Sequence, residues 1–300
     1  MAGGKQGAMA IDYVVPMVFH DDVKWQEDFK AANREYNEAD LGFFVRFRSW
    51  GTEHLLIRCV RKYMPFVRNI YIILARESQK RPWMDEEGVR IVYHRDIIPE
   101  KFLPTFNSLA IEMFLHRIDG LSERFLYGND DMFPLSPLTE DDFFYGDVPC
   151  IVNIEKPLPE RTNIFHRACL NGMNFVGREF GRFFFNTIIR GGHSITPMLK
   201  STWEYLWHIG KEDIEASISP FRQSNNFIQW ICPWWHYLSG NYVNKAPKRV
   251  YVSTKNSIED VVKAISSEDA GIVCINDNEC VSNYMDYGNA VIRAIEEKLK

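Results

Sequence analysis

Residues 124–131, RFLYGNDD, join a short apolar run to a cluster of one asparagine and two aspartates. Apolar runs of about four to eight residues that end in polar residues are typical of buried strands in a parallel sheet. Open α/β sheets bind their ligands outside the carboxyl ends of such strands. The stretch therefore predicts an α/β fold with a ligand crevice beside Asn129, Asp130 and Asp131.

Strand and helix patterns alternate on both sides of this stretch, which predicts parallel pairing in one Rossmann-like, mostly parallel sheet. The run at 11–19 is expected to be a strand that ends before Asp22, in a second polar cluster. Further strands are expected at 69–75, 89–94, 124–127, 250–253 and 272–275, and helices at 52–63, 107–117, 258–265 and 290–300.

A different pattern covers about residues 155–245, where helical periodicity replaces the alternation. Five tryptophans fall between Trp203 and Trp235. Such a cluster indicates the core of a helical subdomain, or an exposed ring on which a sugar stacks. We expect a single catalytic domain over 11–300 with a helical insertion at about 155–245, and a flexible end or vector remnant at 1–10.

The composition of the 300 residues is that of an ordinary folded chain, with 46% hydrophobic and 25% charged residues. A net charge of -5 gives no general attraction for nucleic acid, which we do not expect as a partner. No apolar run is long enough to span a bilayer, and the six cysteines form no CxxC pair. Reduced thiols and a cytoplasmic location are expected, with peripheral attachment to the inner face of the membrane left open.

Two acidic clusters follow apolar strands, one at 129–131 and the other at 276–278. Hard cations such as Mg²⁺ and Mn²⁺ prefer oxygen ligands and accept substrate phosphates as partners. The clusters predict a site for one of these ions, with a solvated turn as the alternative for each.

Six other residues are candidates for chemistry. His193 follows two glycines in an irregular stretch, where it is a candidate general base or a solvated surface residue. Arg222 can hold a phosphate or pair with a surface carboxylate, as can Arg46 and Arg48. Glu112 and His116 lie four residues apart on the expected helix, as a polar pair near the site or, more simply, as a surface contact.

The chain resembles the Stealth family of sugar-1-phosphate transferases, which includes bacterial capsule enzymes and the lysosomal-enzyme N-acetylglucosamine-1-phosphotransferase. The resemblance is carried by IDYVV at 11–15, RFR at 46–48 and the ordered series LPTFNS, IE, HRI, GLS and YGNDD between 103 and 131. It continues with His193 and PMLKST at 197–202, Phe221 and Arg222, QW at 229–230 and CIND at 274–277. These segments appear in the family's order and cover most of the chain.

The resemblance implies a GT-A-like fold and specific roles for several residues. His193 is the implied base and Arg222 the implied phosphate-binding arginine, while Glu112, Asp131 and Asp277 match acidic positions associated with metal or donor phosphate. The expected catalytic residues are Asp131, His193 and Arg222, and the expected metal ligands are Asp130, Asp131, Asn276 and Asp277. Expected substrate-binding residues are Asp12, Asp22, Arg46, Asn107, Ser108, Glu112, His116 and Lys200.

The implied reaction transfers a hexose-1-phosphate, N-acetylhexosamine-1-phosphate in our expectation, from a UDP-sugar to a hydroxyl of an acceptor glycan. Mg²⁺ or Mn²⁺ is the expected cofactor, and UMP leaves. The alternatives are a metal-dependent glycosyltransferase that releases UDP and a non-catalytic glycan-binding module. The chain departs from the family where Asn225 and Asn226 replace a frequent acidic pair, and in the residues after Pro16.

Overall fold

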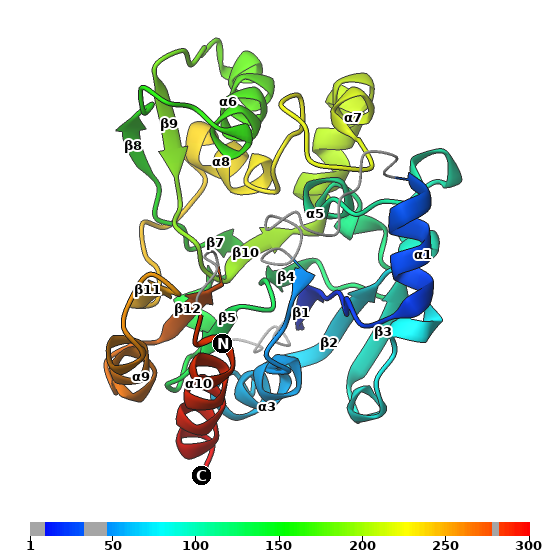
Figure 1. Cartoon of the computed structure of the whole chain (residues 1–300). Helices are drawn as coiled ribbons and strands as arrows, with labels where there is room; N and C mark the ends of the chain where they lie inside the picture. Colours follow the sequence, from blue (N-terminus) through cyan, green and yellow to red (C-terminus); the bar gives the residue numbers. More distant parts are fainter. Residues whose placement is uncertain (1–9, 33–46, 278–281) are drawn as a thin grey trace, which may run out of the picture.

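A five-stranded sheet forms the centre of the protein in the computed structural model, which describes residues 10–32, 47–277 and 282–300 (Figure 1). Its order is β10-β4-β1-β2-β3, and all neighbours are parallel except β10. The strands are β1 (Ile11–Pro16), β2 (Val67–Leu74), β3 (Val89–Tyr93), β4 (Arg124–Tyr127) and β10 (Thr196–Leu199). The strand order reverses between β1 and β4, where α/β sheets place their ligands. The expected α/β, Rossmann-like class is confirmed.

A second, three-stranded sheet adjoins the first and has the order β11-β12-β5. It contains β5 (Met132–Pro134), β11 (Arg249–Ser253) and β12 (Ile272–Asn276). The chain passes from β4 into β5 through the turn at 128–131, and Ile275 N donates to Asp131 O at 2.9 Å. The turn is therefore held at the junction of the two sheets.

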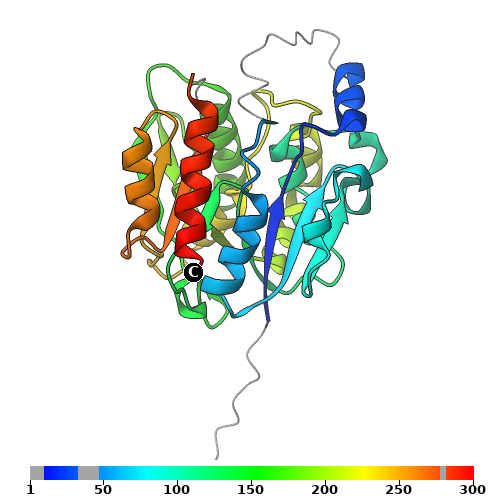
Figure 2. The same cartoon turned by 60° about the horizontal axis from the view of Figure 1, so that its bottom comes forward.

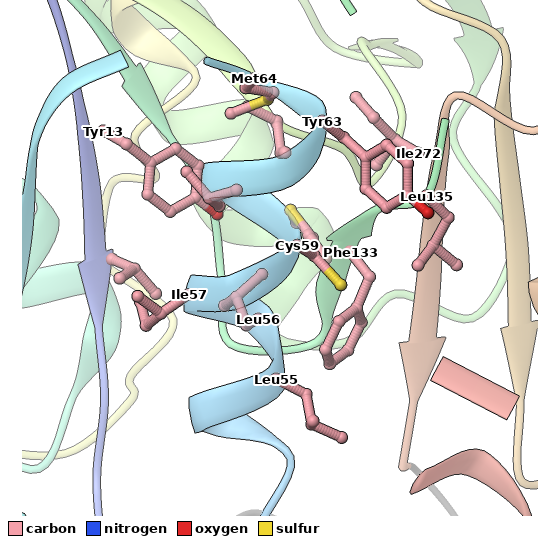
Figure 3. Close-up of a cluster of buried hydrophobic side chains, with 14 of the residues drawn as sticks. Tyr13, Leu55, Leu56, Ile57, Cys59, Tyr63, Met64, Phe133, Leu135 and Ile272 are labelled. Atoms are coloured by element: carbon pink, nitrogen blue, oxygen red, sulfur yellow. The ribbon is translucent and has the colours of Figure 1, made fainter. Parts of the chain in front are cut away.

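Helix α3 (Glu53–Tyr63) packs between these sheets and forms the main core (Figure 3). Its apolar side chains Leu55, Leu56, Cys59 and Val60 are fully buried. In Figure 3, Leu56 and Cys59 lie between Tyr13 of β1 and Phe133 of β5. The spacing of these residues matches the stripe that predicted the helix.

Helices α9 (Ile258–Ser266) and α10 (Tyr284–Lys298) cover the same side of the molecule, next to α3 (Figure 2). Three short helices lie near the carboxyl edge of the central sheet: α1 (Val23–Ala32), α4 (His94–Ile97) and α5 (Ser108–Glu112). There are also two small two-stranded sheets in the described residues. One pairs β6 (Phe144–Tyr145) with β7 (Val148–Pro149), and the other pairs β8 (Ile154–Pro157) with β9 (Thr187–Arg190). Short 3-10 helices occupy Glu77–Gln79, Pro82–Met84, Glu100–Phe102, Leu115–Arg117, Glu140–Asp142 and Arg178–Phe180.

The segment expected to be a helical insertion contains α6 (Ile164–Gly177), α7 (Lys200–Ser217) and α8 (Ile231–Ser239). It also supplies β10, which forms an edge of the central sheet. Trp203, Trp230 and Trp234 are buried, which favours the core interpretation of the tryptophan cluster.

The expected helix at 107–117 is broken in the structure. Helix α5 ends at Glu112, and Leu115–Arg117 form a separate 3-10 turn. Glu112 and His116 therefore share no helix face, and Glu112 is buried, so the polar pair and the favoured surface contact considered from their spacing are both wrong.

The five cysteines in the described part of the chain are free and buried, in agreement with the expected reduced thiols. None of the described helices is long and apolar enough to cross a membrane.

Candidate active site

A cavity of about 730 Å³ opens where β1, β2, β4 and β12 end. Its walls include Met17 after β1, Ala75 after β2, Asn129 after β4 and Asn276 at the end of β12. Pockets of roughly 300–1,000 Å³ are typical of sites for small molecules and cofactors. The crevice expected from the polar ends of the strands is thus present.

The turn at 128–131 is shaped by Tyr13, which lies beneath it. Gly128 N donates to Val14 O at 3.1 Å, and a Cβ at Gly128 would collide with the Tyr13 hydroxyl. Only glycine fits this close approach. The turn thereby brings Asn129, Asp130 and Asp131 to the cavity wall.

Asp131 contacts three polar side chains at the cavity wall. Its Oδ2 accepts from Asn276 Nδ2 at 2.9 Å and from Cys274 Sγ at 3.4 Å, and it lies 3.4 Å from His193 Nε2. Its Oδ1 is buried without a hydrogen-bond partner among the described residues. Burial raises the pKa of Asp131, but the charge and hydrogen bonds of His193 and Asn276 outweigh it and hold that pKa below its usual value.

Asp130 and Glu53 add further acidic groups to the same wall. Burial, followed by repulsion from Asp131 and Glu53, raises the pKa of Asp130 to about 8. Glu53 is itself buried at the start of α3 and accepts a hydrogen bond from Ser49 Oγ. This concentration of acidic groups favours a cation.

The donor set fits a hard cation at Asp131. An unpartnered buried carboxylate oxygen, a second carboxylate at Asp130 and the Asn276 amide provide oxygen ligands of the type that Mg²⁺ and Mn²⁺ prefer. Donor atoms of Asp131, His193 and Cys274 also lie within 4.8 Å of one another. Burial raises the pKa of Cys274, so its thiol remains protonated and is a poor ligand.

Asp277 differs from the expectation that it binds the metal. Both of its carboxylate oxygens accept hydrogen bonds from Arg48, whose guanidinium also lies 4.1 Å from the centre of the Tyr284 ring. This pair engages both oxygens of Asp277 and neutralises its charge, whereas Asp131 keeps one oxygen without a partner among the described residues. The structure instead gives the cavity a buried arginine–aspartate pair.

His193 lies on the loop between β9 and β10 and reaches the cavity because β10 adjoins β4. The preceding Gly192 has φ of +86° and abuts Arg249, so a larger residue would not fit there. Burial lowers the pKa of His193, but the Asp131 carboxylate outweighs burial and the pKa is raised overall.

Arg222 reaches the cavity from the loop between α7 and α8, and its Nη2 donates to Ser108 Oγ at 2.8 Å. Buried amides fix this loop. Asn107 Nδ2 donates to Ser219 O at 3.1 Å and to Asn226 Oδ1 at 3.0 Å. Asn226 Nδ2 in turn donates to Ser217 O at 2.6 Å and to Ser219 Oγ at 2.7 Å. A carboxylate at 226 lacks these donors, which explains why asparagine suits this chain.

Glu112 lies behind the cavity wall. It is 3% exposed, and its Oε1 lies 2.8 Å from the Tyr127 hydroxyl, which is also 2.8 Å from Asn129 Oδ1. Burial, despite the Tyr127 hydrogen bond and the charge of Arg222, raises the pKa of Glu112 to about 7.

Several expected substrate-binding residues lie outside the cavity lining. Asp12 is near the amino end of β1, where it is bound by Arg68 and Ser122. Asp22 caps α1 and accepts from Ser78 Oγ at 2.7 Å. His116 stacks on Trp203, and Lys200 begins α7. Arg46 lies outside the described residues.

The structure brings together Asp130, Asp131, His193, Ser108 and Arg222, with Asn276 and Asp277 beside them. Glu53, His94 and Tyr127 were not predicted as site residues. Glu53 and His94 line the cavity, and each is the first residue of a helix, α3 and α4 respectively. An acidic residue at a helix start is common, so its position in sequence carried no distinct signal.

Comparison with known proteins supports the resemblance. Residues 46–150 match the family described as Stealth protein CR2, conserved region 2. The chain is 31% identical to the receptor polysaccharide phosphotransferase WefC of Streptococcus gordonii, over 96% of each chain. It is 30% identical to the capsular polysaccharide phosphotransferase WcwK of Streptococcus pneumoniae, over 96% of this chain and 95% of the relative.

Among solved structures, the galactosyltransferase LgtC in complex with donor and acceptor sugar analogues covers 95% of both chains at 11% identity, with a TM-score of 0.38. This score has no bearing on activity. The match to the conserved region and the identity over nearly the full length show that the chain belongs to the Stealth family of phosphotransferases.

Proposed function

We propose that this protein transfers a hexose-1-phosphate, with N-acetylhexosamine-1-phosphate as the favoured group, from a UDP-sugar to a hydroxyl of an acceptor glycan. The product is a phosphodiester, and UMP is released. One observation carries the proposal: Asp131, His193 and Arg222 line a single cavity in a chain related to capsular polysaccharide phosphotransferases. The corresponding process is the synthesis of capsular or cell-surface polysaccharide.

The proposed reaction occurs at the phosphorus that carries the sugar. The acceptor oxygen forms a bond to this phosphorus, and the bond from phosphorus to the oxygen shared with UMP breaks. His193 takes the hydroxyl proton, and UMP leaves with the bridging oxygen. Arg222 stabilises the charge on the transferred phosphoryl group through its planar fork of donors.

Asp131, Asp130 and Asn276 are the residues proposed to hold Mg²⁺ or Mn²⁺. A bound cation supplies charge neutralisation at the diphosphate. Binding to the folded state alone also raises thermal stability. Removal of divalent ions with EDTA is therefore expected to abolish turnover and lower Tm, and Mg²⁺ to restore both. An EDTA-treated enzyme with undiminished turnover would remove the cation from the proposal.

The nucleotide product tests the reaction class. The protein is incubated with Mg²⁺, a panel of UDP-sugars and candidate glycan acceptors, and UMP is separated from UDP by ion-exchange chromatography. UMP formed together with a phosphorus-containing glycan is the expected result. Two results would contradict the proposal. Release of UDP in an amount equal to that of the product would identify a glycosyltransferase, and binding of the glycan without turnover would identify a binding module.

His193 is tested in the same assay with a matched control. His193→Ala is expected to lower turnover by about 10²- to 10⁴-fold, the usual contribution of a general base. His208→Ala changes an exposed histidine on α7 outside the cavity and is expected to retain wild-type turnover. Equal turnover in both variants would remove His193 from the reaction.

A further inference from the structure

Glu112, Tyr127 and Asn129 form a hydrogen-bonded row that leads from the interior to the cavity. Glu112 Oε1 and Asn129 Oδ1 each lie 2.8 Å from the Tyr127 hydroxyl oxygen. Glu112 and Tyr127 are buried, whereas Asn129 lines the cavity. The row therefore connects a buried carboxyl group to a side chain that can touch substrate.

The number of hydrogens restricts how this row is arranged. A tyrosine hydroxyl has one hydrogen to donate, so it serves Asn129 Oδ1 or an ionised Glu112, but not both. If Glu112 carries a proton, it donates to Tyr127, and Tyr127 donates to Asn129 Oδ1. If Glu112 is ionised, the Asn129 amide must be reversed so that its Nδ2 faces Tyr127. The state of Glu112 thus determines which end of the Asn129 amide faces the cavity.

Two features favour the protonated arrangement. Glu112 is buried, and its neighbour Gln229 offers a single long contact, from the backbone N to Glu112 Oε2 at 3.4 Å. Burial raises the pKa of Glu112 to about 7, although the charges of Arg222 and His193 act in the opposite direction. A carboxyl group with so few donors is more stable neutral than ionised.

We propose that Asn129 directs its Nδ2 amide into the cavity as a hydrogen-bond donor to a phosphate oxygen of the substrate, and that Tyr127 and protonated Glu112 hold it there. Asn129 Nδ2 makes no hydrogen bond to any described residue, although Asn129 Oδ1 is engaged. Tyr127 and Glu112 are then positioning residues. This inference rests on the proposed phosphotransfer, because it takes a phosphate as the ligand.

Glu112→Gln distinguishes a positioning role from direct participation. Glutamine can accept from Gln229 N and donate through Nε2 to Tyr127, which is the pattern of protonated glutamate. The proposal predicts kcat/KM for the UDP-sugar within about threefold of wild type, and a loss of roughly 10- to 100-fold in Glu112→Ala. A loss in Glu112→Gln as large as that in Glu112→Ala would overturn the proposal.

A double-mutant cycle tests whether Tyr127 acts through Asn129. Asn129→Ala and Tyr127→Phe are each expected to raise KM for the UDP-sugar by roughly 10-fold or more, the value of a hydrogen bond to a charged group. The double variant should be no worse than Asn129→Ala alone. Tyr145→Phe is the control, since this tyrosine is exposed on β6 and lies outside the cavity lining. Additive losses would contradict the proposed row.

Infrared spectroscopy tests the row without relying on turnover. The difference spectrum between wild type and Glu112→Gln at pH 6 is expected to contain the C=O band of a protonated carboxylic acid. A carboxylate band in its place would overturn the inference even if the transfer reaction is established. Conversely, the acid band with no UMP release in any assay would leave the arrangement intact and exclude the phosphate ligand.

Discussion

Asp12 and Asp131 are two aspartates associated with neighbouring strands, and they differ in how far their carboxylates are satisfied. Asp12 lies near the amino end of β1 and accepts six hydrogen bonds, from Arg68 Nε and Nη2, Asn69 N and Nδ2, and Ser122 N and Oγ. Asp131 follows the carboxyl end of β4, and its buried Oδ1 has no partner among the described residues. Both oxygens of the Asp12 carboxylate are hydrogen-bonded, whereas Oδ1 of Asp131 is available to a ligand.

This difference separates a structural charge from a functional one. A buried carboxylate oxygen without a donor costs free energy, and a folded protein retains such an atom where a ligand or reaction uses it. A fully hydrogen-bonded carboxylate instead stabilises the fold locally. The comparison predicts that substitutions at the two sites affect different measurements.

Asp131→Asn is expected to have the largest effect on activity. It removes the charge proposed to hold the cation and the partner of His193, so turnover should fall by about 10³-fold. Stability should fall by only about 1 kcal/mol, because the amide oxygen can still accept from Asn276 and Cys274 while the attraction to His193 is lost. Initial rates of UMP release and urea unfolding measure the two quantities. A strongly destabilised variant with normal turnover would show that Asp131 has a structural role and not the proposed functional one.

Asp12→Asn is expected to show the opposite behaviour. An amide accepts through one atom only, so Arg68 and Ser122 lose partners and the free energy of unfolding should fall by about 3 kcal/mol. The folded variant should retain wild-type kcat, since Asp12 is outside the cavity lining. A large loss of kcat at full folding would place Asp12 in the reaction after all.

The pH dependence of stability sharpens the same contrast. Burial raises the pKa of Asp12, but the hydrogen bonds from Arg68 and Ser122 outweigh it and lower the folded-state pKa. The ionised Asp12 carboxylate therefore adds to the free energy of unfolding at pH values above its unfolded-state pKa, which is near 3.9 for aspartate. This stabilisation is lost as the pH falls through the folded-state pKa. The stability gap between wild type and Asp12→Asn should therefore narrow below about pH 4. A gap that widens with acid would contradict this assignment.

Asn226→Asp extends the comparison to the cavity wall, with a smaller expected effect. The carboxylate cannot donate to Ser217 O or Ser219 Oγ, so we expect a loss of about 2 kcal/mol. Turnover should fall with it, because this loop carries Arg222. The neighbouring Asn225→Asp is the control, since it also removes an amide donor, from Nδ2 to Ala216 O, but at an exposed position, where a change within about 0.5 kcal/mol is expected. Equal stability of the two variants would refute a structural role for Asn226.

Cys274→Ser is expected to have the smallest effect. The serine hydroxyl can replace the thiol as a donor to Asp131 Oδ2, and turnover with Mg²⁺ should fall by less than about threefold. A different result would indicate that Cys274 is a thiolate ligand. In that case the variant would lose turnover with Mg²⁺, and a thiol-preferring ion would support turnover in the wild type but not in the variant.

The sequence predicted the central sheet and the place of the cavity, because buried strands and the polar residues after them are local features. Strand β4 was predicted at its observed bounds, and Asp131 lies where the carboxyl-end rule places it. The same rule, applied to Asp12 at the start of its strand, would have excluded Asp12 from the site. The resemblance to a family motif included it nonetheless.

Other features depend on contacts between distant parts of the chain. Asp277 was expected to bind metal, and the structure pairs it with Arg48, 229 positions away in sequence, which donates to both carboxylate oxygens. The expected helix at 107–117 breaks because Glu112 turns inward to Tyr127 while His116 stacks on Trp203. Tertiary contacts of this kind override local periodicity, and one sequence does not reveal them.

Transfer of phosphorus to the glycan is the central claim, and the fate of the β-phosphate tests it most directly. A UDP-sugar labelled with ³²P at the β-phosphate is incubated with the enzyme, Mg²⁺ and the acceptor glycan, and nucleotide and glycan are separated. The account predicts that the label enters the glycan in step with unlabelled UMP release. Label retained in UDP while the glycan gains an unlabelled sugar would contradict it.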